Sequence, residues 1–184
     1  MKLRLAAIAA ALAMTGCASY NAQPYTTLAD SQIAIKQAST ESGSGKVALE
    51  AVTLRAGVSP ALTCRAAGPV NPAPGKTASQ YIEEALKSEL YQAGIYDPTA
   101  INRIRAQITA LGFSSMGDSN WTMGLHLVSK SMPDGYTVDI QYPFTAGFIA
   151  DFACRNVAEA FAPAVQQLVR KAVTDPQFKQ LIKP

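Results

Sequence analysis

The sequence predicts an α+β fold in which an antiparallel sheet of about four strands carries two main helices on one face, in the order β-α-β-β-β-α. Two observations predict it. Three consecutive segments in the second half of the chain alternate apolar and polar residues across short connections, and two longer segments repeat apolar residues at helical spacing. Strands that follow one another closely form antiparallel sheets, and helices with one apolar stripe cover one face of such a sheet.

The first strand and the first main helix are expected between residues 46 and 94. Residues 46–55 carry apolar side chains on both alternating faces, which predicts a well-covered strand. After a loop rich in Pro and Gly, Thr77 and Gln80 form the signature of a helix capping box, and Gly94 marks the helix end. The apolar stripe of this helix consists of Ile82, Ala85, Leu86 and Leu90.

Three strands are expected next, at residues 101–111, 120–130 and 136–144. Each alternates apolar and polar side chains, so one face of the sheet is buried and the other is polar. Pro133-Asp134-Gly135 has turn chemistry and predicts the connection before the third strand.

A long helix is expected at the C-terminal end, between residues 156 and 173. Pro163 lies inside it and predicts a kink or a break, because proline removes a backbone donor. Asp175-Pro176 predicts the start of a last short helix that carries Phe178 and Leu181.

The chain opens with a short basic and apolar segment. Lys2 and Arg4 precede about ten apolar residues, and the small residues Thr15 and Gly16 come before Cys17. This order is typical of a secretory signal. The apolar run is too short to cross a membrane as a helix, which needs about 20 residues.

Met14-Thr15-Gly16-Cys17 resembles the lipobox of bacterial lipoproteins, with Met where Leu is usual. The resemblance implies that residues 1–16 are a lipoprotein signal peptide and that Cys17 becomes the lipidated first residue, with a diacylglycerol thioether and an N-acyl chain such as palmitate. Cys17 is followed by Ala18 and not by Asp. By the same resemblance, this implies an anchor in the outer membrane, with the domain facing the periplasm of a Gram-negative bacterium. More than one acyl chain holds a protein stably at a bilayer. The alternative is an ordinary signal peptide with a coincidental cysteine.

Residues 17–45 are predicted to be the lipidated N-terminus and a flexible tether, and residues 46–184 the periplasmic α+β domain. Residues 18–45 are polar, contain few large aliphatic side chains and end in Gly and Ser. The alternation of Ile33 and Ile35 leaves a short strand open as an alternative.

Lipidation of Cys17 would leave Cys64 and Cys154 as a pair in an oxidising compartment, where a disulfide is the expected state. It would close a loop of about 90 residues and stabilise the fold by about 4–5 kcal/mol on the chain-entropy model. Two buried free thiols or a weak metal site are the alternatives. The chain has one histidine, so a zinc site would lack ligands.

Charge and motifs argue against nucleic-acid and nucleotide binding. Of the 16 basic residues, Lys2 and Arg4 leave with the signal, so 14 balance 13 acidic residues and no strongly basic surface is expected. Gly75-Lys76-Thr77 copies the end of a phosphate-binding loop, but Val70 stands where the motif needs its first glycine.

No group of residues indicates catalysis, a cofactor or a metal site. His126 is the only histidine, and no GxSxG elbow offers it a nucleophile, so a surface role is favoured. Arg103 and Arg105 share a strand face with Gln107, which is more typical of a solvated face than of a stripe that binds phosphate or carboxylate groups. A cell-wall hydrolase is the least favoured alternative.

Residues 77–182 resemble the YajG-type outer-membrane lipoproteins of Gram-negative bacteria. The segments that carry the resemblance are "YIEEALKSELYQAGIY", "IRAQITALG", the W-x-M-x-L-x-L strand and "NVAEAFAPAVQQLVRKAVTDPQFKQLI". More distantly, the layout is similar to auxiliary envelope lipoproteins that serve ABC transporters or activate cell-wall synthases.

The predicted lipid anchor, the long spacer and the lack of any catalytic group favour a non-enzymatic accessory or scaffold protein. It would bind another cell-envelope component through its sheet edge or polar face. The alternative is a carrier or transporter-auxiliary protein that binds lipid or another apolar ligand. Such a carrier needs a cavity between the helices and the sheet.

Overall fold

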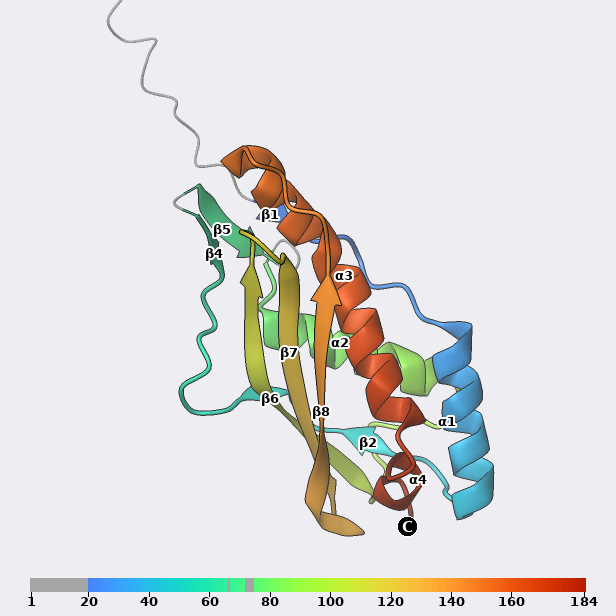
Figure 1. Ribbon diagram of the computed structural model, residues 1–184. Helices are drawn as coiled ribbons and strands as arrows, with labels where there is room; N and C mark the ends of the chain where they lie inside the picture. Colours follow the sequence, from blue (N-terminus) through green and yellow to red (C-terminus); the bar gives the residue numbers. More distant parts are fainter. Residues whose placement is uncertain (1–19, 66, 72–74) are drawn as a thin grey trace, which may run out of the picture.

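The protein has a mixed α+β fold with helices packed on a sheet, as the sequence predicts (Figure 1). The computed structural model describes residues 20–65, 67–71 and 75–184. In chain order the elements are β1 (Tyr20–Asn21), α1 (Ala29–Ser42), β2 (Ala48–Leu49), β3 (Thr53–Leu54), β4 (Thr63–Cys64), β5 (Gly68–Asn71), α2 (Ala78–Gln92), β6 (Arg103–Ser114), β7 (Asn120–Ser129), β8 (Met132–Pro143), α3 (Ala150–Thr174) and α4 (Phe178–Leu181).

The main sheet has five strands, in the order β2-β6-β7-β8 with β3 also paired to β6. The long strands β6, β7 and β8 form the predicted antiparallel meander. The predicted first strand is instead two short strands, and both run parallel to β6. The reason is topological, because the chain returns to β6 through α2, and a crossover of this length joins parallel strands.

A second, smaller sheet in the order β1-β5-β4 lies at one end of the molecule. Tyr20 pairs with Val70 in parallel, and Thr63 pairs with Pro69 in antiparallel register. This sheet therefore joins the first described residues of the chain to the segment that precedes α2.

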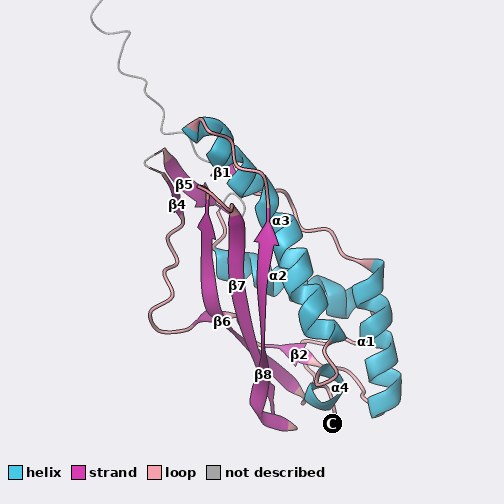
Figure 2. Ribbon diagram, viewed as in Figure 1, coloured by secondary structure: helices cyan, strands magenta, loops and turns pink. Residues whose placement is uncertain are grey.

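Helices α2 and α3 cover one face of the main sheet, and no helix formed by the described residues lies on the other face (Figure 2). An aromatic cluster fills the layer between sheet and helices. The ring of Trp121 lies 4.9 Å from that of Phe161, which lies 5.1 Å from that of Tyr81. Trp121 Nε1 also donates to Val157 O at 2.9 Å, so the buried indole is satisfied. These side chains occupy the layer in which a carrier would need its cavity.

The prediction of a flexible tether through residue 45 is wrong for residues 29–42, which form helix α1. This helix packs against α2, α3 and α4. Ile35 is fully buried while Ile33 is 54% exposed, because residues two apart lie on opposite sides of a helix. Small polar residues dominate the rest of α1, so its packing surface is narrow and the sequence signal is weak.

Two details of the connections also differ from the sequence predictions. The β7–β8 turn lies at Lys130–Ser131, because Ser129 pairs with Met132, and residues 133–135 form an irregular start to β8. Gly135 has a φ of 61°, and a Cβ there would lie 2.1 Å from Leu127 O, so the Gly is required for the strand to bend rather than for the turn.

Helix α3 begins six residues earlier than predicted and continues through Pro163 without a break. The hydrogen bond that Pro163 omits is the one to the carbonyl of Glu159, an exposed residue whose carbonyl can bond to water. Cys154 consequently lies inside α3 and not before it.

Candidate functional site

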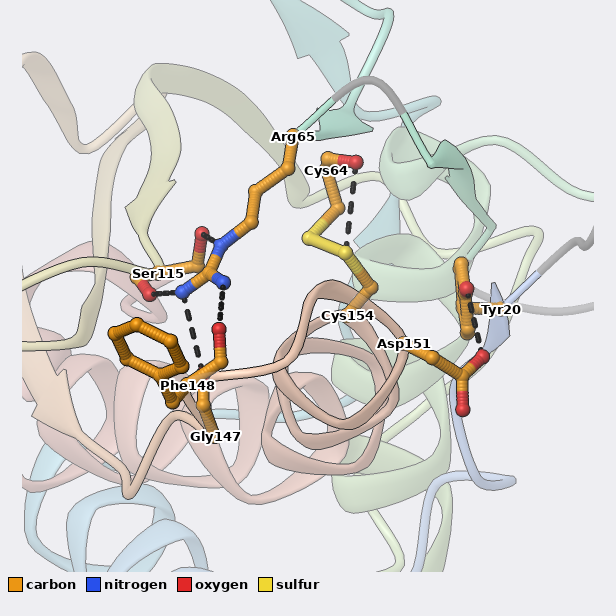
Figure 3. The surroundings of a disulfide bond; sticks show 8 residues. All are labelled: Tyr20, Cys64, Arg65, Ser115, Gly147, Phe148, Asp151 and Cys154. Carbon is orange, nitrogen blue, oxygen red and sulfur yellow. Dashed lines mark hydrogen bonds between the residues drawn. A yellow bond between two sulfur atoms is a disulfide. The ribbon is translucent and has the colours of Figure 1, made fainter.

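A buried disulfide joins Cys64 at the end of β4 to Cys154 in α3 (Figure 3). The two Cα atoms are 5.6 Å apart, the sequence separation is 90 residues, and both side chains are fully buried. The predicted pairing is confirmed. The disulfide attaches helix α3 to strand β4.

Arg65, directly after the disulfide, binds two loops that are far apart in the sequence. Its Nε donates to Ser115 Oγ at 3.1 Å, and one terminal nitrogen also donates to the Ser115 carbonyl oxygen. The other terminal nitrogen donates to Phe148 O at 3.0 Å. The nitrogen that bonds to the Ser115 carbonyl also donates to Gly147 O at 3.3 Å. The guanidinium group has five N–H donors in a fixed planar arrangement, so it can bond to both loops at once. A lysine could not bridge both loops in this way. Arg65 therefore fixes the β6–β7 loop against the β8–α3 loop.

Four large apolar side chains project from these loops and from the start of α3. Their exposed fractions are 73% for Met116, 101% for Phe148, 60% for Ile149 and 54% for Phe152. A cleft of about 660 Å³ opens between the two loops, and Arg65 and Ser115 line it together with Met116, Phe144 and Phe148. In Figure 3 the ring of Phe148 lies on the opposite side of the Arg65 guanidinium from the disulfide. We call Met116, Phe148, Ile149 and Phe152 the apolar tip.

The first described residue of the chain lies at the same end of the molecule as the apolar tip, on the other side of the disulfide from Phe148 (Figure 3). Tyr20 Oη donates to Asp151 Oδ1 at 3.0 Å, and Asp151 stands between Ile149 and Phe152 in sequence. Burial and the hydrogen bond to Asp151 both raise the pKa of Tyr20, so the phenol keeps its proton and remains the donor.

The face of the main sheet that lacks helices is polar. Arg103 and Arg105 are exposed there, as predicted, and a shallow groove of about 300 Å³ runs past Arg105, Gln107, Glu50 and His126. His126 Nδ1 lies 2.9 Å from Thr137 Oγ1, a neutral hydroxyl. The contact fixes the ring on the surface but supplies no carboxylate of the kind that orients a catalytic histidine.

Strand β8 forms one edge of the main sheet, and β7 is the one strand in the described part of the chain that pairs with it. Hydrogen-bonded and non-bonded pairs alternate in an antiparallel ladder. Phe144 N–H donates to Ser119 O, so the even-numbered residues of β8 bond toward β7. The backbone groups of Thr137, Asp139 and Gln141 therefore point outward. Lys171 Nζ, which donates to Asp139 O at 2.7 Å, agrees with this direction.

Glu89 of α2 is a fully buried carboxylate that holds the start of α1. Its Oε1 accepts from Tyr25 Oη at 2.7 Å and from the backbone N–H of Leu28, the N-cap of α1, at 2.8 Å. Among the described residues its Oε2 has no hydrogen-bond partner. Burial raises the pKa of Glu89, and the two hydrogen bonds oppose the rise in part.

The sequence pairs the cysteines correctly but does not identify Arg65, Glu89 or the apolar tip. Arg65 acts through loops 50 and 83 residues away in sequence, a separation that no periodicity reveals. The signal for the tip is Phe148-Ile149 directly after Gly147, a pair of large apolar residues in a segment where turn residues are usual.

Cys17, the predicted lipidation residue, lies outside the described residues. Within residues 20–65, 67–71 and 75–184, no helix has the length and apolar character that crossing a membrane requires. In the same part of the chain, no three His, Cys, Asp or Glu side chains gather into a group that could bind a metal ion.

No protein-family model and no curated protein matches the chain. Among solved structures, the chain is similar to protein XCC0632 from Xanthomonas campestris, of the DUF330 family, with a TM-score of 0.49, 13% identity, and coverage of 89% of this chain and 99% of that one. It is also similar to an uncharacterized protein with a TM-score of 0.43 and 8% identity, over 84% of this chain and 99% of the other.

Proposed function

We propose that this protein is a non-enzymatic, lipid-anchored accessory protein of the outer membrane, with its domain in the periplasm, and that it binds another envelope component along the free edge of β8. The observation that carries the proposal is the row of outward backbone groups at Thr137, Asp139 and Gln141. Unpaired groups on a sheet edge accept an extended segment of another chain as an additional strand.

The side chains beside this edge suit a polar partner surface. Thr137, Asp139 and Gln141 are exposed and alternate with the buried Val138 and Ile140, so their side chains project from the face opposite the helices. An added strand would gain backbone hydrogen bonds from β8 and side-chain contacts from this face. Lys171 occupies one outward carbonyl, so a partner must displace or accommodate its ammonium group.

The edge is tested by comparing Gln141→Pro with Gln141→Thr. Proline removes one outward donor, is tolerated on the open side of an edge strand, and leaves the bonds to β7 in place. Threonine keeps the N–H and suits a strand. In cells crosslinked before lysis, we expect Gln141→Pro to lower recovery of the envelope partner about tenfold, the equivalent of about 1.4 kcal/mol. Gln141→Thr should recover it like the unsubstituted protein.

A photoreactive residue at position 141 locates the contact independently, with the same residue at Glu41 of α1 as the control site. Glu41 is exposed and belongs to a different element. Adducts to one envelope component from position 141 and none from position 41 support the proposal. Equal adducts from both, or undiminished recovery with a folded Gln141→Pro variant, reject binding along β8.

The anchor is tested with labelled palmitate in the same cells. We expect the unsubstituted protein and Cys64→Ser to take up label and sediment with envelopes. Cys17→Ser should lose both, because the acyl chains supply the membrane affinity. Sedimentation of Cys17→Ser with envelopes, or label that persists in it, rejects lipid anchoring at this residue.

A further inference from the structure

The apolar tip is the concentration of exposed large apolar side chains at one end of the molecule. It gathers four of the seven exposed large hydrophobic residues in the described part of the chain. They come from the β6–β7 loop, the β8–α3 loop and the first turn of α3, which meet at that end (Figure 1). A cluster of this kind on a water-soluble surface marks a contact with another apolar phase or molecule.

The backbone that presents the tip is fixed. Arg65 holds the carbonyls of Gly147 and Phe148 and the Ser115 loop, and the adjacent disulfide attaches the same segment to α3 (Figure 3). The rings of Phe148 and Phe152 therefore project from a stiff platform. Such a platform loses little conformational entropy when its side chains enter another phase.

The start of the described chain lies at the same end. Tyr20 is bonded to Asp151, between Ile149 and Phe152 in sequence, and it is paired with Val70 in the small sheet. Two residues, Ala18 and Ser19, separate it from Cys17. Three residue steps span at most about 11 Å in an extended chain. Helix α4 and the β7–β8 turn lie at the opposite end of the molecule. Acyl chains on Cys17 would thus enter a bilayer at the end of the molecule that carries the apolar tip.

We propose that the apolar tip inserts into the interfacial layer of the bilayer that holds Cys17. This inference rests on the lipid anchor of the proposed function. The domain then stands on the membrane at its disulfide end, with α4 directed away from it. At the start of α3, Arg155 forms an ion pair with Asp151, and the Arg65 guanidinium is bonded to oxygens of Ser115, Gly147 and Phe148. The contact is accordingly apolar and does not require anionic lipid.

The test places an indole at the tip of the full, acylated chain. Phe148→Trp is compared with Ile101→Trp, because Ile101 is 94% exposed and precedes β6 at the opposite end. Each protein is reconstituted in phosphatidylethanolamine–phosphatidylglycerol vesicles, with and without lipids brominated in the acyl chains. The native Trp121 is fully buried, and its emission is subtracted with the unsubstituted protein.

We expect the emission added by Phe148→Trp to shift to shorter wavelength and to lose most of its intensity in brominated vesicles. The emission added by Ile101→Trp should change in neither respect. Unquenched emission from Phe148→Trp overturns the proposal, and so does equal quenching at both positions, which would mean that the domain lies on its side. A blue shift that depends on protein concentration and not on bromine would assign the tip to a second copy of the chain instead.

Mass spectrometry of the vesicle-bound protein separates this inference from the proposed function. Protein that carries its acyl chains but shows no quenching rejects insertion of the tip and leaves the anchor intact. Protein without acyl chains that fails to join the vesicles rejects both. Partner binding along β8 is measured separately and does not depend on the tip.

Discussion

At the scale of single residues, Glu89 is a carboxyl group that folding removes from water. Its carboxylate is buried, and its pKa in the folded protein lies above the ordinary value of 4.5. The folded state therefore holds this proton more tightly than the unfolded state. The contribution to stability is complete below about pH 4.5 and is lost as the pH rises through the raised pKa.

Glu89→Gln should remove this pH dependence. The glutamine keeps an oxygen that can accept from Tyr25 Oη and Leu28 N–H, and it carries no charge. We expect the free energy of unfolding in urea to fall less steeply with rising pH above 4.5 in this variant than in the unsubstituted protein. Glu84→Gln on the exposed side of α2 is the matched control. Parallel pH profiles for all three proteins would show that Glu89 is not the responsible group.

At the scale of elements, the packing of helix α1 decides whether residues 29–42 are docked on the domain or belong to a flexible tether. Ile35 is fully buried and Ile33 is 54% exposed in the same helix, so the two residues form a matched pair. We expect Ile35→Ala to lower the free energy of unfolding by about 2–4 kcal/mol, as for a buried large-to-small change. Ile33→Ala should stay within about 0.5 kcal/mol of the unsubstituted protein. Equal, small effects in urea denaturation would mean that α1 is not docked.

The elements also show which structure a sequence can predict. The α2 capping box and the alternation of β6, β7 and β8 are local patterns, and the structure confirms them. Helix α1 and the continuous helix α3 depend on packing against elements distant in sequence. This packing stabilises α1 despite its polar composition and α3 despite Pro163. The sequence predicts the β7–β8 turn at Pro133–Gly135 and not at Lys130–Ser131, because a strand bend and a turn use the same residue types.

At the scale of the whole molecule, the disulfide is the largest single constraint on the unfolded chain. Its loop encloses α2 and the whole β6–β8 meander. We expect the double variant Cys64→Ser, Cys154→Ser to lose about 4–5 kcal/mol of unfolding free energy on the chain-entropy model. A reducing agent should destabilise the unsubstituted protein to a similar extent and leave the double variant unchanged. Equal denaturation midpoints for the oxidised protein and the variant would contradict this.

Some features of the candidate surfaces can be predicted from local sequence patterns, and others depend on contacts between distant segments. The cysteine count and the polar face of the sheet can be obtained from residue types and alternation. The apolar tip and the Arg65 contacts cannot, because three segments separated by up to 83 residues create them only after folding. The outward direction of the β8 backbone follows from the register, which one residue of slip would reverse.

The Cys64–Cys154 pair has a consequence for maturation. Three thiols allow three different pairings. If the chain is exported from its N-terminus, as the proposed function requires, Cys64 would emerge after Cys17 and before Cys154. Under the proposed acylation the Cys17 sulfur is a thioether and cannot exchange, which leaves Cys64 a single correct partner. Lipid attachment would then act as a chemical protecting group, and a precursor denied its lipid should accumulate scrambled isomers joined through Cys17.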